Sequence, residues 1–231
     1  MERIFSYRFL KAAHPVAGSS RGYTLIEMLI VLAIIIIIAA IAIGGQSNFN
    51  RTLSLNNAAF DIALSIRQAQ SFGLSSRSAS GVSNAGYGLH FNRTEESSYI
   101  FFADTKPSAS SDATPDTKPG NGIYYTGGTA TSMDTLVATY TLNNGFTISG
   151  FCAYDASANV WDCTSDTDPL RFLDIVFTRP NSDVRVHGRT NSGTGYLSYV
   201  KACITVAGPT GETRSVSVSD TGQVSTVSTC P

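Results

Sequence analysis

The sequence has little charge and few residues suited to catalysis or metal binding. Asp, Glu, Lys and Arg make up 14% of its 231 residues, against roughly 25% in a typical soluble domain. With only 16 Lys and Arg residues and a formal net charge of −1, a generally basic nucleic-acid-binding protein is disfavoured. The three histidines, His14, His90 and His187, are too widely spaced to suggest a multi-histidine metal site. The sequence also has no G-x-S-x-G or other nucleophile signature, so we expect neither catalytic residues nor a cofactor.

What the chain does have is one long apolar run near its N-terminus. Sixteen consecutive Ala, Val, Ile, Leu or Met residues extend from Met28 to Ile43. As a helix, residues 23–45 would measure about 34 Å, enough to cross a hydrocarbon core of about 30 Å. The run is longer than the h-region of a cleaved secretory signal, which has about 7–15 residues. A buried core helix is the alternative, and we favour a transmembrane helix over residues 23–45.

The charges on either side of this run predict its orientation. Residues 1–22 carry a net charge of +3, from four basic residues and Glu2, so the rest of the chain carries −4. Positively charged flanks remain on the cytoplasmic side of a membrane. We therefore expect a single-pass protein with a cytoplasmic N-terminus and an exported remainder.

A specific motif precedes the apolar run, Arg21-Gly22-Tyr23-Thr24-Leu25-Ile26-Glu27. It resembles the class III signal of type IV prepilins and pseudopilins, in which a basic leader ending in Gly is followed by an aromatic residue, Thr-Leu-[IV]-Glu and a long apolar stretch. Most relatives have Phe where this chain has Tyr23. The resemblance implies that prepilin peptidase removes the leader, residues 1–22, by cutting after Gly22, and that Tyr23 becomes N-methylated.

The same resemblance implies a location and partners. The chain would sit in the bacterial cytoplasmic (inner) membrane and contact an inner-membrane assembly platform. Its N-terminal helix would then pack with other pilins or pseudopilins in an extracytoplasmic filament. That filament would be a type IV pilus or a type II secretion pseudopilus, serving protein secretion, adhesion, motility or DNA uptake.

Glu27 is a carboxylate at the edge of the apolar segment. Such a group is costly in lipid and needs a positive partner at equal depth. Cleavage after Gly22 would create one, the α-amino group of Tyr23, which a neighbouring subunit can present. We therefore expect an assembly role for Glu27. The alternative is the ordinary preference for acidic residues in the first turn of a helix.

Beyond the membrane segment, an amphipathic continuation of the helix is expected over residues 46–75. The apolar residues at spacings of four and three predict one buried face that ends near Gly73; they are Leu55, Ala59, Ile62, Ile66 and Ala69. The pair Gly44-Gly45 lowers helix propensity by roughly 1 kcal/mol per residue, so we expect a locally loosened helix there.

Residues 76–231 show short β-like runs bounded by turn residues, which predicts an α+β fold with an antiparallel sheet domain. A flexible loop is expected at about 104–122, where Pro, Ser, Thr, Asp and Gly are abundant, and a tight hairpin at 220–223. The expected strands are 87–91, 98–102, 136–142, 146–149, 170–177, 184–187, 197–206, 214–219 and 224–227.

This second part also resembles the GspH/FimT-type minor pseudopilins, through residues 174–184, 202–206 and 214–224. The resemblance implies two sheets packed near the C-terminal half of the helix and a structural role. The alternative function is a DNA-binding FimT-like minor pilin for DNA uptake. Residues 220–231 contain no Lys or Arg, so a phosphate-binding patch would have to come from Arg179, Arg185, Arg189 and Arg214.

The four cysteines all lie in the part expected to be exported, where an even number allows two disulfides. Three pairings are possible, and we favour Cys152–Cys163 with Cys203–Cys230 over a zinc site, because no C-x₂-C spacing occurs. Three nearby aspartates, Asp162, Asp166 and Asp168, lack the Gly and final Glu of a calcium loop of the EF-hand kind. We interpret them as a solvated acidic loop and expect no metal.

Overall fold

The computed structural model describes residues 22–75, 77–105, 120–125, 134–180 and 184–231. The expected leader, apart from Gly22, and most of the expected loop at 104–122 lie outside the described residues. The chain divides into two compact units, Met1–Ser47 and Asn48–Pro231. Each is described by itself.

Helix α1 (Leu25–Leu74) begins at a polar cap. The hydroxyl of Thr24 accepts a hydrogen bond from the backbone amide of Glu27 at 3.3 Å, which satisfies one of the free donors at a helix N-terminus. Gly44 and Gly45 both lie within the helix, so the expected loosening does not interrupt it. Their cost of roughly 1 kcal/mol each does not break a helix that continues on both sides of the pair.

Two antiparallel sheets form the rest of the described second unit, as the α+β prediction required. The first sheet has the strand order β3-β2-β1-β6-β7-β8 and the second has the order β11-β10-β9-β4-β5. The strands of the first sheet are β1 (Gly86–Asn92), β2 (Ser98–Asp104), β3 (Thr135–Thr141), β6 (Leu170–Phe177), β7 (Val184–Thr190) and β8 (Leu197–Tyr199). Those of the second are β4 (Thr147–Asp155), β5 (Val160–Cys163), β9 (Lys201–Ala207), β10 (Thr213–Val218) and β11 (Val224–Val227).

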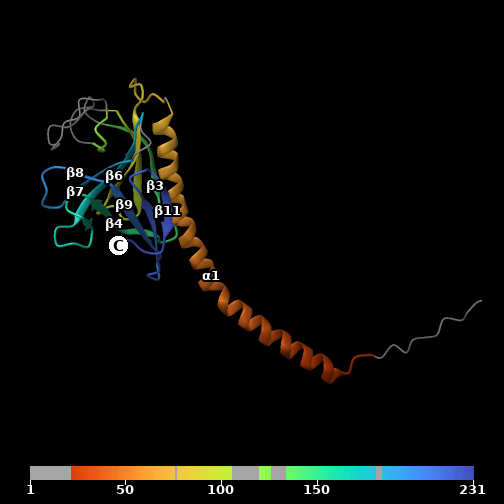
Figure 1. The fold of residues 1–231 in the computed structure, drawn as a ribbon. Coiled ribbons are helices and arrows are strands. Elements are labelled where there is room, and N and C mark those ends of the chain that lie inside the picture. Colours follow the sequence, from red (N-terminus) through yellow and green to blue (C-terminus); the bar gives the residue numbers. More distant parts are fainter. Residues whose placement is uncertain (1–21, 76, 106–119, 126–133, 181–183) are drawn as a thin grey trace, which may run out of the picture. The chain divides into compact units, whose positions relative to one another are not determined.

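The core of this unit gathers one face of α1 and the inner faces of both sheets. All five apolar residues predicted to form the buried face of the helix are 3% exposed or less. Phe72 packs edge-on against Phe101 of β2, with ring centroids 5.6 Å apart. Arg67 donates a hydrogen bond to the carbonyl of Val224 in β11 at 2.9 Å. The second half of α1, in gold in Figure 1, therefore lies against both sheets.

Gly73, near the end of α1, allows the helix to approach β6 closely. A Cβ atom at this position would lie 2.1 Å from the carbonyl oxygen of Phe177, and a backbone oxygen cannot rotate away. We expect Gly73→Ala to lower the free energy of unfolding by about 2–3 kcal/mol, measured by denaturant titration of the full chain in detergent. The control is Ser71→Ala, an exposed change on the same helix, which should stay within about 0.5 kcal/mol. Equal stability of both variants would contradict the close approach.

Two predicted strands differ from those observed, and one observed strand was missed. The expected strand 197–206 is two strands, because the chain leaves the first sheet after β8 and enters the second at β9. The expected strand 146–149 continues to Asp155, past a register shift between Ile148 and Gly150. The short strand β5 was not predicted. The hairpin at 220–223 is confirmed: Gly222, with φ of 77°, donates to the carbonyl of Ser219 at 2.9 Å.

Candidate functional site

The N-terminal segment of α1 is apolar and entirely exposed. Residues Leu25–Ile43 form a 19-residue stretch with a mean hydropathy of 3.2, none of it buried. Large apolar side chains within it range from 43% exposed at Val31 to 84% at Leu25. So much apolar surface is unfavourable in water and requires a lipid or protein environment. By length and composition, the segment can cross a membrane.

The residues of the predicted signal lie together at the start of this segment. Tyr23 is 74% exposed, and a Cβ atom added to Gly22 would meet nothing within 4 Å. Both flanks of the expected scissile bond are therefore open. Glu27 lies in the first turn of α1, and Thr24 and Glu27 have the Thr-x-x-Glu spacing of a helix capping box. This gives the first-turn explanation of Glu27 a direct structural basis alongside the expected assembly role.

A second apolar surface lies on the helix within the larger unit. Phe49, Leu53, Phe60 and Leu64 are 44–63% exposed, and their spacing places them within an arc of about 60°. We call these four residues the outer stripe. It lies on the side of the helix away from the buried face centred on Ile62. Sequence reasoning followed only the buried positions, although the same helical period identifies the outer ones.

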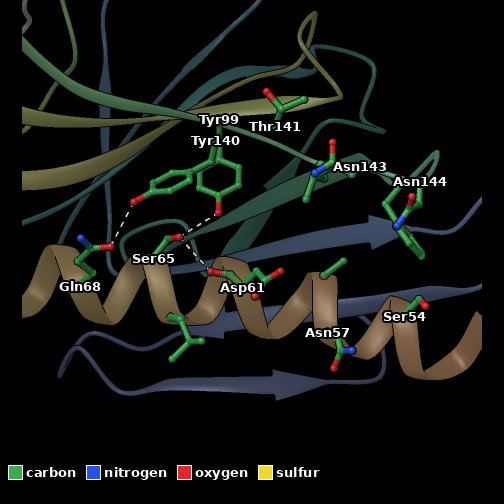
Figure 2. A pocket seen from close by; sticks show the side chains of 14 residues that line it. Ser54, Asn57, Asp61, Ser65, Gln68, Tyr99, Tyr140, Thr141, Asn143 and Asn144 are labelled. Carbon is green, nitrogen blue, oxygen red and sulfur yellow. Dashed lines mark hydrogen bonds between the residues drawn. The ribbon is translucent and has the colours of Figure 1, made fainter.

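A groove of about 480 Å³ runs between α1 and residues 140–146 (Figure 2). Tyr99 shares a hydrogen bond of 2.9 Å with Ser65, and the Tyr140 hydroxyl donates to Gln68 at 3.2 Å. Asp61 points into the gap between the helix and Asn143 (Figure 2). Burial raises the pKa of Tyr99 to about 12, so its hydroxyl stays protonated. The two tyrosines tie β2 and β3 to the helix.

His90 and Asp174 form a buried pair in the first sheet. They stand opposite each other on β1 and β6, with His90 Nδ1 2.7 Å from Asp174 Oδ1 and exposures of 7% and 0%. The imidazole lies between Tyr124 and Phe172, whose ring centroids are 4.9 and 5.5 Å away. Buried groups of this kind are tolerated only when partnered, so loss of either member would leave the other buried without its partner.

Two further carboxylates hold residues 120–125 against the end of the first sheet. The carboxylate of Asp104 accepts hydrogen bonds from the amides of Asn121 and Gly122 at 3.1 and 2.7 Å. Asp134 accepts from Thr105 and Tyr125 at 3.0 and 2.9 Å. Burial, and next the charge of Asp134, raise the pKa of Asp104 to about 8. Asp104 is therefore largely protonated at neutral pH in the folded chain.

This pKa predicts that stability falls as the pH rises. Between about pH 4 and pH 8, folded Asp104 holds a proton that the unfolded chain releases, so its contribution is lost as the pH increases, by up to about 1.4 kcal/mol per unit. Thermal melts between pH 6 and pH 8 should show a falling melting temperature, and Asp104→Asn should flatten the slope. Asp155→Asn is the control, because hydrogen bonds from Ser157 lower the pKa of Asp155, which keeps its titration below this range. A wild-type slope that survives Asp104→Asn would assign the effect to another group.

The cysteines form the favoured pairs, Cys152–Cys163 and Cys203–Cys230. Among the described residues, no three His, Cys, Asp or Glu side chains gather as a metal site. The three aspartates, of which Asp162 lies in β5 rather than in a loop, hold local structure. Asp162 accepts from the Tyr199 hydroxyl, Asp166 from the amide of Cys163, and Asp168 from Ser192.

The four arginines considered for DNA binding do not all lie on one sheet. Arg185 and Arg189 are in β7 of the first sheet, whereas Arg214 is in β10 of the second. Arg214 donates to Asn56 of α1 at 2.9 Å, and the Arg189 guanidinium lies 4.8 Å from the centre of the Phe172 ring. Arg179 follows β6. Because Arg189 and Arg214 pack on protein groups, this arrangement lends no support to a converging phosphate site.

Comparison with protein families adds one finding. Residues 18–43 match the family model described as the prokaryotic N-terminal methylation motif. Neither curated proteins nor solved structures give a significant match. The matched residues include Gly22, Tyr23 and Glu27 and the whole exposed apolar segment. The N-terminal part of the chain thus carries a prokaryotic methylation motif, which supports a type IV pilin-like subunit processed by prepilin peptidase.

Proposed function

We propose that the chain is a structural minor pilin or pseudopilin of the GspH/FimT type. The observation that carries the proposal is the methylation motif over residues 18–43, which coincides with an exposed apolar helix. A membrane peptidase and a filament both require such a segment. The two sheets packed on the second half of α1 are the arrangement that the GspH/FimT resemblance implies.

The proposed location is the bacterial cytoplasmic membrane before assembly. The net charge of +3 on residues 1–22 favours a cytoplasmic N-terminus. The two disulfides support an oxidising compartment for the second unit. After cleavage the helix remains as the anchor, and an assembly platform in the same membrane moves the subunit into the filament.

In the filament, neighbouring helices provide the apolar environment that lipid provided before. Within the second unit, the outer stripe gives α1 an exposed apolar surface of its own, at Phe49, Leu53, Phe60 and Leu64. Burying a large apolar side chain contributes about 1.5–3 kcal/mol. The stripe therefore supports contacts with other pilins beyond the membrane segment.

Processing is the first test of this function. We expect protein from the native host to begin at N-methyl-Tyr23, because Gly22 presents no side chain next to the bond to be cut. Mass spectrometry of the intact chain measures both the loss of 22 residues and the added methyl group. Gly22→Lys should accumulate as the uncut precursor. The lysine side chain fits at this position without a clash, because nothing lies within 4 Å of a Cβ atom added to Gly22.

The control for processing is Ser71→Lys, which adds the same side chain at an exposed position of α1 far from the expected cut. That variant should be cut at the wild-type position. Recovery of Met1 in assembled filaments of the wild type would reject the proposed function.

A further inference from the structure

Three of the four cysteines form a row across the second sheet. Cys163 of β5 stands opposite Cys152 of β4, and Cys152 stands opposite Cys203 of β9. Directly opposed residues of antiparallel strands point to the same face, with Cβ atoms about 4.5–5.5 Å apart. The residues that alternate with them, such as Phe151 and Ile204, lie in the core. The cysteine row therefore occupies the outer face of the sheet.

Cys203 has two cysteines within bonding reach. It is bonded to Cys230, with a Cα–Cα distance of 5.7 Å. Cys152, its cross-strand neighbour, is bonded on its other side to Cys163. Opposed residues in an antiparallel pair have Cα atoms about 4.5–5.5 Å apart, within the range of about 4.4–6.8 Å that disulfides span. A Cys152–Cys203 bond thus keeps the register of β4 and β9, and needs only a small approach of the two Cβ atoms to the roughly 3.5–4.5 Å of a disulfide.

Cys163 does not have this reach. It lies two strands away from Cys203, and strands are about 4.8 Å apart, so its Cα is roughly 10 Å from that of Cys203. This distance exceeds the span of a disulfide. Of the two cysteines in the Cys152–Cys163 bond, only Cys152 is therefore close enough to Cys203 to form a disulfide with it.

The two disulfides also open onto the same hollow. A hollow of about 270 Å³ is lined by Cys152 and Cys230 together with the C-terminal Pro231. Cys203 is 1% exposed, whereas Cys230 is half-buried. The hydroxyl of Thr205 donates to Cys230 Sγ at 3.2 Å, and a donor of this kind stabilises a departing thiolate. Cys230 is accordingly the better leaving group of its pair.

We propose that Cys152, Cys203 and Cys230 form a thiol–disulfide exchange site, in which Cys152 and Cys230 compete for Cys203. A dithiol reductant opens Cys152–Cys163, becomes a disulfide itself and leaves two thiols. The Cys152 thiolate attacks Cys203 Sγ, the Cys152–Cys203 bond forms, and the Cys203–Cys230 bond breaks. Cys230 leaves as a thiolate and takes up a proton, so the exchange itself involves no net oxidation. The product frees residues 228–231 from their covalent link to β9.

A matched pair of variants tests this exchange. Cys163→Ser and Cys152→Ser lose the same disulfide, and therefore share any loss of stability, but only Cys163→Ser keeps the cysteine beside Cys203. The full chains, in detergent, are equilibrated in a buffer of reduced and oxidised glutathione, quenched with acid and alkylated. Peptide mass mapping then identifies each disulfide and each free thiol.

We expect Cys163→Ser to contain the Cys152–Cys203 bond, which Cys152→Ser cannot form, and to have alkylated Cys230 at a level at least about tenfold above that in Cys152→Ser. Cys152→Ser should retain Cys203–Cys230 and be alkylated at Cys163. The proposal is overturned if Cys163→Ser is alkylated only at Cys152. It is equally overturned if both variants release Cys230 to the same extent, because that would indicate general loosening of the tail. The wild type, treated with one equivalent of dithiothreitol, should also yield the Cys152–Cys203 peptide.

Discussion

Glu27→Ala is expected to leave the chain processed and inserted in the membrane but almost absent from filaments. In a filament the Glu27 carboxylate would pair with the amino group of Tyr23 on an adjacent subunit, away from water. Removing one member of a buried charge pair costs about 3–5 kcal/mol, which corresponds to more than a hundredfold loss in assembly. The helix cap should survive, because the hydrogen bond to Thr24 uses the backbone amide of Glu27.

The measurement compares sheared filament and membrane fractions after co-expression with the other pilins of the host. Processing should remain normal, since the expected cut lies five residues before Glu27. Glu27→Asp keeps the charge on a shorter side chain, so its recovery in filaments should be intermediate. Glu27→Gln keeps the size of the side chain but not the charge, so it should be as poorly recovered in filaments as Glu27→Ala. Wild-type recovery of Glu27→Ala in filaments would leave the first-turn preference as the explanation of this residue.

His90→Leu should destabilise the second unit by about 3–5 kcal/mol, the largest effect we expect from a change in the fold. Asp174 is 0% exposed, and its Oδ1 lies 2.7 Å from His90 Nδ1. Leucine removes that partner and leaves the carboxylate in a core that cannot solvate it. Denaturant titration of the full chain, followed by near-ultraviolet circular dichroism, measures the change.

The double variant His90→Leu/Asp174→Leu distinguishes loss of the pair from loss of packing. Replacing both partners removes the unsolvated carboxylate, so the double variant should recover part of the stability lost by His90→Leu alone. A double variant that loses the sum of the two single effects would show that His90 and Asp174 act independently.

Features encoded by neighbouring residues were predictable from the sequence. The apolar run from Met28 to Ile43 and the helical period that buries Leu55 to Ala69 are local patterns, and both appear in α1. The strand boundaries were harder to predict. The change of sheet at Val200 has no local signal, because the sequence on either side is continuous β-type. Strand β5, with only four residues, is too short to establish a period.

The buried polar contacts could not be predicted, because their members are distant in the chain. His90 and Asp174 are 84 residues apart, and no pattern within either strand indicates the other. The same is true of the amides of Asn121 and Gly122, which bind Asp104 from 17 and 18 residues away. The cysteine pairs were easier, since four residues allow only three pairings. The row of three cysteines could not be predicted, because it depends on the register of β5, β4 and β9.

The long-range contacts of α1 also set an order of events during synthesis. Arg67 bonds to Val224, 157 residues later, and Asn56 bonds to Arg214, 158 residues later. Contacts across such sequence distances close slowly and late in folding. The helix face therefore stays uncovered until nearly the whole chain has been synthesised. Until then the apolar residues of this face have no sheet to pack on, so the burial that stabilises the second half of α1 is the last part of the fold to be completed.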